Sequence, residues 1–127
     1  MRPNDRSYLD SHEWAQLQGD VATVGITDFA VEQLGELVYL DLPEIGQNVT
    51  RGESFGEVES VKAVSDINSP VNGEVVEINS DLPDALDPLQ SDALNSGWLI
   101  KVKVSGADAL DGLKDAAAYE EVVASES

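Results

Sequence analysis

The strongest secondary-structure signal in the sequence is the alternation over residues 98–104, Trp-Leu-Ile-Lys-Val-Lys-Val. Successive side chains of a β-strand point to opposite faces of the sheet, so this period of two predicts a strand. The apolar face is expected to carry Trp98, Ile100, Val102 and Val104. Leu99, Lys101 and Lys103 fall on the other face. The segment therefore predicts a sheet with one buried face.

Short runs of β-branched and aromatic residues, bounded by glycine, proline or asparagine, recur along the chain. They predict strands over residues 21–26, 37–42, 55–60, 63–67 and 75–78. The polar segment 81–97, which contains two prolines, is predicted to be a loop with one helical turn. Short strands with frequent turn signals are typical of a β-sandwich or barrel with small helices attached.

Two helices are predicted. Thr27 places a hydroxyl where it can cap a short helix over residues 28–34, and Gly35 follows as the terminating residue. Asp115 is expected to cap an alanine-rich C-terminal helix over residues 115–124. One face of that helix carries Ala116, Tyr119, Val122 and Val123 at helical spacing.

Length and charge limit the classes of protein to consider. The 127 residues are expected to form a single domain, residues 1–127, with a core over residues 8–105 and, without cysteine, no disulfides. Aspartate and glutamate number 25 against 7 lysines and arginines, a formal charge of −18. Such a surface repels nucleic acid and anionic membranes, and no signal or membrane span is evident. We expect a cytoplasmic monomer.

Residues 35–41, Gly-Glu-Leu-Val-Tyr-Leu-Asp, resemble residues 73–79, Gly-Glu-Val-Val-Glu-Ile-Asn, and Leu-Pro follows both. This similarity points to an internal repeat and hence to two related halves of the fold. Lys62 lies between them, at a turn that would hold a side chain clear of the sheet. Chance similarity between two strands is the alternative.

Lys62 is the only basic residue between Arg51 and Lys101. Most surface lysines are simply solvated, and Val61-Lys62 lacks the Asn-Gly or Asp-Gly signal of a tight hairpin turn. A free lysine, with a pKa of about 10.4, is a poor nucleophile at neutral pH, and Schiff-base catalysis usually requires a desolvated amine. An exposed lysine is better suited to acylation by another enzyme, which would create a long tether.

The sequence around Lys62 resembles the lipoyl-attachment region of glycine cleavage H proteins. The matching residues are Glu-Ser-Val-Lys-Ala at 59–63 and Ser-Asp-Ile-Asn-Ser-Pro-Val-Asn-Gly-Glu-Val at 65–75. The resemblance continues, in order and spacing, over residues 11–14, 24–30, 34–38, 97–103 and the terminal helix with Tyr119. One departure is Ala93-Leu94-Asn95, where the family usually has Pro-Tyr-Gly, and it leaves the conformation of the acidic loop 81–96 open.

The resemblance implies a mainly β fold, a barrel-sandwich hybrid of two antiparallel sheets with the lipoyl-lysine on a hairpin tip, a short helix near 28–34 and a C-terminal helix. It implies a non-catalytic carrier with (R)-lipoate covalently bound to Lys62. The arm would take the aminomethyl group of glycine from a pyridoxal-phosphate glycine decarboxylase (P protein) to a tetrahydrofolate-dependent aminomethyltransferase (T protein). Dihydrolipoyl dehydrogenase (L protein) would reoxidise the arm, and a separate lipoylating enzyme would install it.

The resemblance also implies roles for other residues. Glu59 and Gly73 match positions that lipoylating enzymes read. Ser11, Glu13 and Asp66 match residues of a cleft that shelters the loaded arm, where a carboxylate suits a cationic aminomethyl group. Simpler explanations stand beside these roles: a surface acid for Glu13, a local turn bond for Asp66, and backbone freedom in a turn for Gly73.

The sequence predicts no catalytic residue and no metal site, because no metal-ligand spacing, phosphate loop or nucleophile–base pair is evident. His12, Trp14 and Trp98 are assigned to packing.

Three other functions remain open. Lipoyl carriers of other complexes, or a lipoate relay, usually have Asp-Lys-Ala at the attachment site, whereas this chain has Val-Lys-Ala at 61–63. Biotin carriers usually bracket the lysine with methionines, and the single methionine here is Met1. The third is an unmodified β-rich interaction module.

The charge leads to a prediction about salt. We favour adaptation to a salt-rich cytoplasm over ordinary acidity, because molar salt shortens the Debye length to about 3 Å and screens repulsion between carboxylates. Thermal unfolding followed by circular dichroism should therefore require a higher temperature in molar KCl than in dilute buffer. Greater stability in dilute buffer would contradict the halophile hypothesis.

Overall fold

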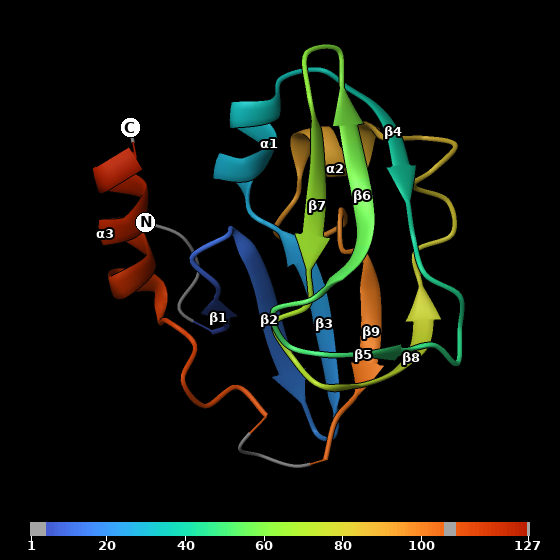
Figure 1. The fold of residues 1–127 in the computed structure, drawn as a ribbon, viewed down its shortest axis with the longest axis vertical. Helices are drawn as coiled ribbons and strands as arrows, with labels where there is room; N and C mark the ends of the chain where they lie inside the picture. The colour runs from blue at the N-terminus through green and yellow to red at the C-terminus, as the bar shows by residue number, and fades with distance from the viewer. Residues whose placement is uncertain (1–4, 106–108, 127) are drawn as a thin grey trace.

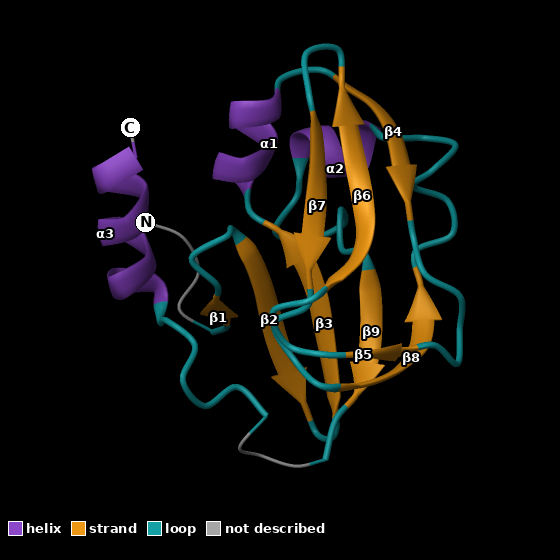
Figure 2. Ribbon diagram, in the orientation of Figure 1, coloured by secondary structure: helices purple, strands orange, loops and turns teal. Residues whose placement is uncertain are grey.

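The computed structural model describes residues 5–105 and 109–126, which fold into two antiparallel sheets and three helices (Figures 1 and 2). The six-stranded sheet has the order β1-β2-β3-β9-β8-β5, with β1 (Ser7–Tyr8), β2 (Glu13–Gln18), β3 (Val21–Ile26), β5 (Asn48–Val49), β8 (Gly73–Ile78) and β9 (Ile100–Lys103). The three-stranded sheet has the order β4-β6-β7, with β4 (Leu37–Asp41), β6 (Ser54–Ser60) and β7 (Val64–Asn68). The helices are α1 (Asp28–Leu34), α2 (Asp87–Ser91) and α3 (Ala116–Glu126). The predicted mainly β fold with two antiparallel sheets, a short helix and a C-terminal helix is confirmed.

One hydrophobic core joins the two sheets. The three-stranded sheet contributes Leu40, Val58 and Ile67, and the six-stranded sheet contributes Val24, Val75 and Val102, all at most 2% exposed. Full burial of each such side chain stabilises the fold by roughly 1.5–3 kcal/mol. The hairpin that carries Lys62 is therefore built on a strand pair anchored by its inner face.

The alternation over residues 98–104 is only partly confirmed. Ile100, Val102 and Val104 are buried as predicted, but Leu99 is fully buried and Trp98 only partly so. The segment between β8 and β9 explains the difference, because its Leu82, Leu89 and Ala93 join the same core as Leu99. That segment contains the expected helical turn, α2.

Three strands lack a counterpart among the strands predicted from the sequence. These are the two-residue strands β1 and β5 and the full-length strand β2, whose sequence Glu-Trp-Ala-Gln-Leu-Gln mixes polar and apolar residues. β2 pairs with β3 along its whole length, from Glu13↔Ile26 to Gln18↔Val21. Partner strands rather than local propensity define β2.

The predicted caps at Thr27, Gly35 and Asp115 are confirmed. In α1, the Thr27 hydroxyl accepts a hydrogen bond from the Ala30 N–H, and Gly35 follows at φ 85°. In α3, the Asp115 carboxylate accepts from the Ala118 N–H at 2.8 Å. The apolar face of α3 closes a second, smaller cluster that contains Tyr8, Trp14, Ala116 and Tyr119. The rings of Tyr8 and Tyr119 stack at a centroid distance of 4.7 Å.

The two segments of the suspected repeat lead into strands of different sheets, β4 and β8. Their glycines serve different purposes. Gly35 ends α1 with a positive φ, whereas a Cβ on Gly73 would lie 2.1 Å from the Lys103 carbonyl oxygen. Internal repetition stays a prediction.

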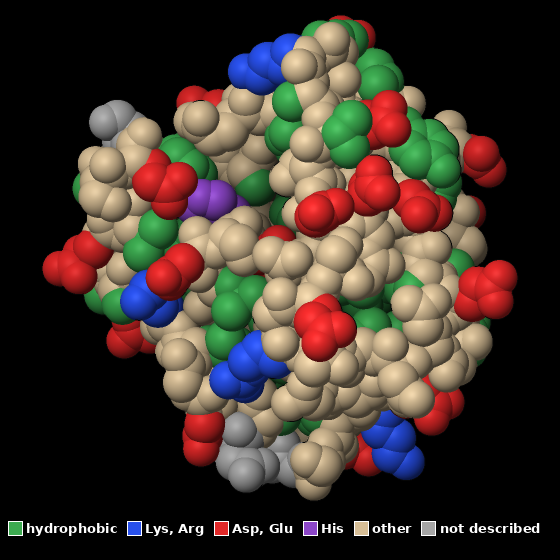
Figure 3. Space-filling view, in the orientation of Figure 1, with side chains coloured by type: hydrophobic (Ala, Val, Ile, Leu, Met, Phe, Trp, Pro, Cys, Tyr) green, Lys and Arg blue, Asp and Glu red, His purple; other side chains and the backbone are tan. Residues whose placement is uncertain are grey.

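On the face of the molecule drawn in Figure 3, acidic side chains are far more frequent than basic ones, and several lie over the three-stranded sheet. Over the described residues, no helix combines the length and apolar character needed to cross a lipid bilayer.

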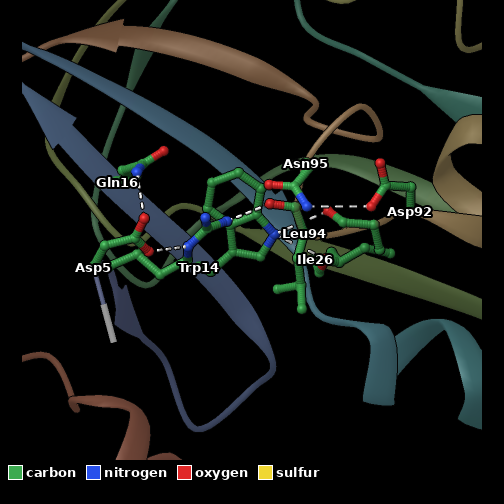
Figure 4. Close-up of polar contacts among 9 residues, drawn as sticks. Asp5, Trp14, Gln16, Ile26, Asp92, Leu94 and Asn95 are labelled. Carbon is green, nitrogen blue, oxygen red and sulfur yellow. Dashed lines mark hydrogen bonds and ion pairs between the residues drawn. The ribbon is translucent and has the colours of Figure 1, made fainter. Parts of the chain in front are cut away.

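A buried cation fastens the N-terminal segment to the loop before β9 (Figure 4). The Arg6 guanidinium lies 4.6 Å from the centre of the Trp14 ring, and it donates to the Leu94 carbonyl and, at 2.9 Å, to Asp5. The Trp14 indole donates to the Ala93 carbonyl at 3.2 Å. The loop contributes main-chain carbonyls to these contacts, and such groups are present whatever the side chain. The loop therefore stays attached although residues 93–95 are Ala-Leu-Asn and not the usual Pro-Tyr-Gly.

We expect Arg6→Met to lower the free energy of unfolding by about 2 kcal/mol, because the Leu94 carbonyl loses a charged donor that protein atoms cannot replace. Urea denaturation measures the change. Lys103→Met removes an exposed cation of similar length and is the matched control, with a change near zero. Equal effects of the two substitutions would show that Arg6 acts only through net charge.

Candidate functional site

Lys62 lies at the tip of the β6–β7 hairpin, at the top of Figure 1. The strand ladder ends with the pair Glu59↔Val64, and residues 61–63 beyond it are exposed. Among the residues that the structure describes, the Lys62 ammonium has no hydrogen-bond or ion-pair partner. The amine is therefore accessible to another protein.

The turn at Val61-Lys62 does not use the positive φ angles of the commonest two-residue hairpin turns. Instead, the Ser60 hydroxyl oxygen accepts hydrogen bonds from the N–H groups of Lys62 and Ala63, at 3.3 and 3.2 Å. The Ser60 N–H donates to the Ala63 carbonyl at 2.8 Å, and the Val61 N–H donates to the Glu36 carbonyl at 3.0 Å. Ser60 therefore fixes the turn that an Asn-Gly pair would fix elsewhere.

Asp66 belongs to a row of three exposed carboxylates on the outer face of the three-stranded sheet. Asp41 is the register partner of Glu57, and Glu57 is the partner of Asp66. Like charges opposite one another on a sheet repel, which fits the expectation that salt stabilises this protein. Within the described chain, the Asp66 carboxylate makes no hydrogen bond, so the local turn bond considered for it is absent.

Glu13 is buried, at 1% exposure, and is not a surface acid. Its carboxylate accepts hydrogen bonds from the Ser11 hydroxyl at 2.5 Å and from the Asn68 N–H at 2.8 Å. Desolvation outweighs these bonds and raises the pKa of Glu13 to about 7. Because Asn68 ends β7, this carboxyl group joins β2 of one sheet to the strand that follows Lys62 in the other.

The structure thus brings Ser11 and Glu13 together at the far end of β7 from Lys62. At about 3.3 Å per residue, β7 rises about 13 Å from residue 64 to residue 68, and the Glu13 contact lies at its end away from the hairpin tip. A hollow of about 470 Å³ borders Ser11 and Asn68 and is also lined by Leu9, Leu113 and Lys114. Asp66 lies on the same strand, but no described contact links it to Glu13.

The two positions assigned to lipoylation lie in different sheets. Glu59 is half-buried in β6, where its register partners are Tyr39 and Val64. Gly73 begins β8, and its φ is not positive, so backbone freedom in a turn is the wrong explanation for it. The close approach of the Lys103 carbonyl explains the glycine instead.

The packing assignment of His12 agrees with its surroundings. Its ring lies 5.0 Å from the Phe29 ring, and Nδ1 lies 2.7 Å from the Tyr119 hydroxyl. Trp14, 1% exposed, is a core residue as predicted, whereas Trp98 is only partly buried under the Lys101 ammonium, 5.1 Å from its ring centre.

Sequence reasoning did not assign a role to Ser60 or Asn68. Ser60 carries a signal that could have been used, since serine is favoured at the first position of a four-residue turn. Asn68 contributes its backbone N–H to Glu13, and no side-chain pattern reveals such a contact.

The family model for the glycine cleavage H-protein matches residues 6–126. The chain belongs to this family. It is 52% identical to the glycine cleavage system H protein of Acaryochloris marina over 93% of this chain and 92% of that protein. It is 56% identical to that of Rhodopirellula baltica, over the same shares of the two chains. The crystal structure of the H protein from Mycobacterium marinum superimposes with a TM-score of 0.90 at 40% identity, covering 97% of this chain and 99% of that one.

Membership of the H-protein family confirms the predicted role. The chain is a carrier component of the glycine cleavage system, and its partners are components of that system. Nearly full-length coverage in both directions means that the role applies to the whole fold and not to a shared motif.

The raised pKa of Glu13 predicts a pH-dependent stability. The folded protein keeps a proton on Glu13 up to about pH 7, whereas the unfolded chain loses it near 4.5, so this group makes stability fall as the pH rises through that window. Glu13→Gln keeps an acceptor for the Asn68 N–H, offers the Ser11 hydroxyl an amide donor in place of an acceptor, and carries no charge. The difference in unfolding free energy between the variant and wild type should therefore change by about 2–3 kcal/mol in favour of the variant as the pH rises from 5 to 8.

Urea unfolding at a series of pH values measures this difference. Asp66→Asn removes an exposed carboxylate from the same hairpin sheet and should shift stability by a smaller amount that varies little with pH. A parallel pH dependence for wild type and Glu13→Gln would contradict the assignment.

Proposed function

We propose that Lys62 carries (R)-lipoate in an amide bond and that this arm transports the aminomethyl group of glycine. The observation that supports the proposal is an exposed amine at a projecting hairpin tip, in a chain of the H-protein family. Acylation removes a charge that has no partner within the described residues, so no ion pair there is broken. The turn is held by Ser60 and Glu36, and the modification leaves these contacts in place.

When bound to Lys62, the lipoyl group would supply a disulfide able to take up the aminomethyl group. The protein holds the base of the arm on a fixed turn and raises the local concentration of its cargo at each partner. We propose no catalytic residue and no metal in this chain, so that the chemistry belongs to the partner enzymes.

Ser11 and Glu13, at the end of β7 away from Lys62, would hold the loaded end of the arm. An ionised Glu13 attracts a cationic aminomethyl group, and a pKa of about 7 leaves this carboxyl partly ionised near neutral pH. Asp66 adds an exposed negative charge on the same strand.

The partners follow from this role. We propose glycine decarboxylase as the enzyme that loads the arm, aminomethyltransferase as the one that unloads it, and dihydrolipoyl dehydrogenase as the one that reoxidises it. A lipoylating enzyme acts once on Lys62 and contacts the surroundings of Glu59. Gly73 is tightly packed against Lys103, so we propose that it affects lipoylation indirectly, through the position of β8. We expect a single-domain monomer in the cytoplasm.

The alternatives are a lipoyl carrier or lipoate relay for another complex, and an unmodified interaction module. The intact mass of the protein purified from its source separates these classes of function. One added lipoyl group supports carriage, a biotin group supports a different carrier, and an unmodified mass favours the module.

Lys62→Arg provides the direct test, because it keeps the positive charge but removes the amine that is acylated. The variant should lack the lipoyl mass and lose glycine–bicarbonate exchange in the reconstituted system, while its unfolding free energy changes by less than about 0.5 kcal/mol. Lys103→Arg, on an exposed strand position, is the control and should behave as wild type. Exchange at the wild-type rate with Lys62→Arg would refute the proposal.

A further inference from the structure

The side-chain amide of Gln90, in α2, bridges the two peptide groups that flank Glu36. Its Nε2 donates to the Gly35 carbonyl at 3.0 Å, and its Oε1 accepts from the Leu37 N–H at 2.9 Å. Gln90 is 28 positions from Lys62 in the sequence, within the loop-rich segment that precedes β9. This bridge joins α2 to the connection between α1 and β4.

The bridge also determines where the Glu36 carbonyl points. The Glu36 carbonyl and the Leu37 N–H belong to one planar trans peptide unit, so they point in opposite directions. Because Gln90 holds the Leu37 N–H on one side, the Glu36 carbonyl faces the other side. There it accepts the Val61 N–H at 3.0 Å, one residue before Lys62.

This connection needs a restraint. Gly35 precedes it at φ 85°, and glycine leaves its neighbouring peptides with the most conformational freedom. α2 is a firm base for the restraint because Leu89, next to Gln90, is fully buried. Ser60 orders the turn internally, whereas the Glu36 carbonyl links it to the rest of the molecule.

We infer that Gln90 is a positioning residue for the modification of Lys62: by orienting the Glu36–Leu37 peptide, it holds the lysine turn in the conformation that the lipoylating enzyme recognises. This inference rests on the proposed attachment of lipoate to Lys62. A turn that is ordered only part of the time binds more weakly in proportion to its ordered fraction. The loss of Gln90 should therefore affect substrate binding more than the acyl-transfer step.

Gln90→Met removes both hydrogen bonds and keeps the length of the side chain. Loss of a bridge of this strength should raise amide hydrogen exchange at Val61 and Leu37 by about fivefold. With a purified lipoate–protein ligase, ATP and lipoate, the KM for the full-length apoprotein should rise by about fivefold and kcat should stay unchanged. Gln90→Glu keeps the acceptor for Leu37 but not the donor for Gly35, so both effects should be intermediate.

Gln33→Met is the matched control, since Gln33 is an exposed glutamine of α1 whose side chain makes no hydrogen bond among the described residues. It should leave exchange and KM at wild-type values. A role of Gln90 in stability alone would change the unfolding midpoint without selective exchange at Val61 and without a change in KM. That result, or unchanged exchange with normal KM, would overturn the inference.

The two proposals fail in distinguishable ways. If wild-type protein is not acylated at Lys62, the proposed function is wrong, and the exchange measurement still reports whether Gln90 orders the turn. If wild type is acylated and Gln90→Met is acylated with the same KM, the proposed function stands and the positioning role does not.

Discussion

The position of the carrier lysine depends on the packing of the three-stranded sheet against the six-stranded sheet. Side chains such as Val58 and Ile67 bury the inner face of β6 and β7, so that only the outer face and the tip of the hairpin meet solvent. A hairpin without this support would be marginal in water. The apolar layer therefore makes a rigid support for Lys62, whose own side chain contributes nothing to the core.

Polar contacts complete what the apolar layer begins. At one end of the hairpin sheet, the Glu13 carboxyl joins β2 to the last residue of β7. At the other end, the Glu36 carbonyl receives the N–H of Val61. The first contact puts an acid with a pKa near 7 in a protected site, which lowers stability as the pH rises from about 4.5 to about 7. We interpret that cost as a consequence of placing a negative charge where the loaded arm is proposed to rest.

Two cations of this acidic chain, Arg6 and Arg51, bind main-chain carbonyl groups. Arg6 binds the Leu94 carbonyl, and Arg51 donates to the carbonyls of Pro70 and Asp111 at 2.9 and 2.6 Å. Arg6 fastens the N-terminal segment to the loop before β9, and Arg51 joins the segment after β7 to the segment after β9. They consequently do little to offset rows of surface carboxylates such as Glu57 and Asp66, and repulsion at the surface is left to dissolved salt.

The sequence by itself determined the strands β3, β4, β6, β7, β8 and β9, the caps at Thr27 and Asp115, and the importance of Lys62, because these depend on local periodicity, local hydrogen bonds and a contiguous motif. It misplaced Leu99, since the cover on that face comes from a distant segment. Only the tertiary structure decided that Glu13 is buried and that Gln90 reaches the connection behind the lysine turn. Both depend on backbone groups far apart in the chain, and hydrogen bonds to backbone groups leave no side-chain pattern to read.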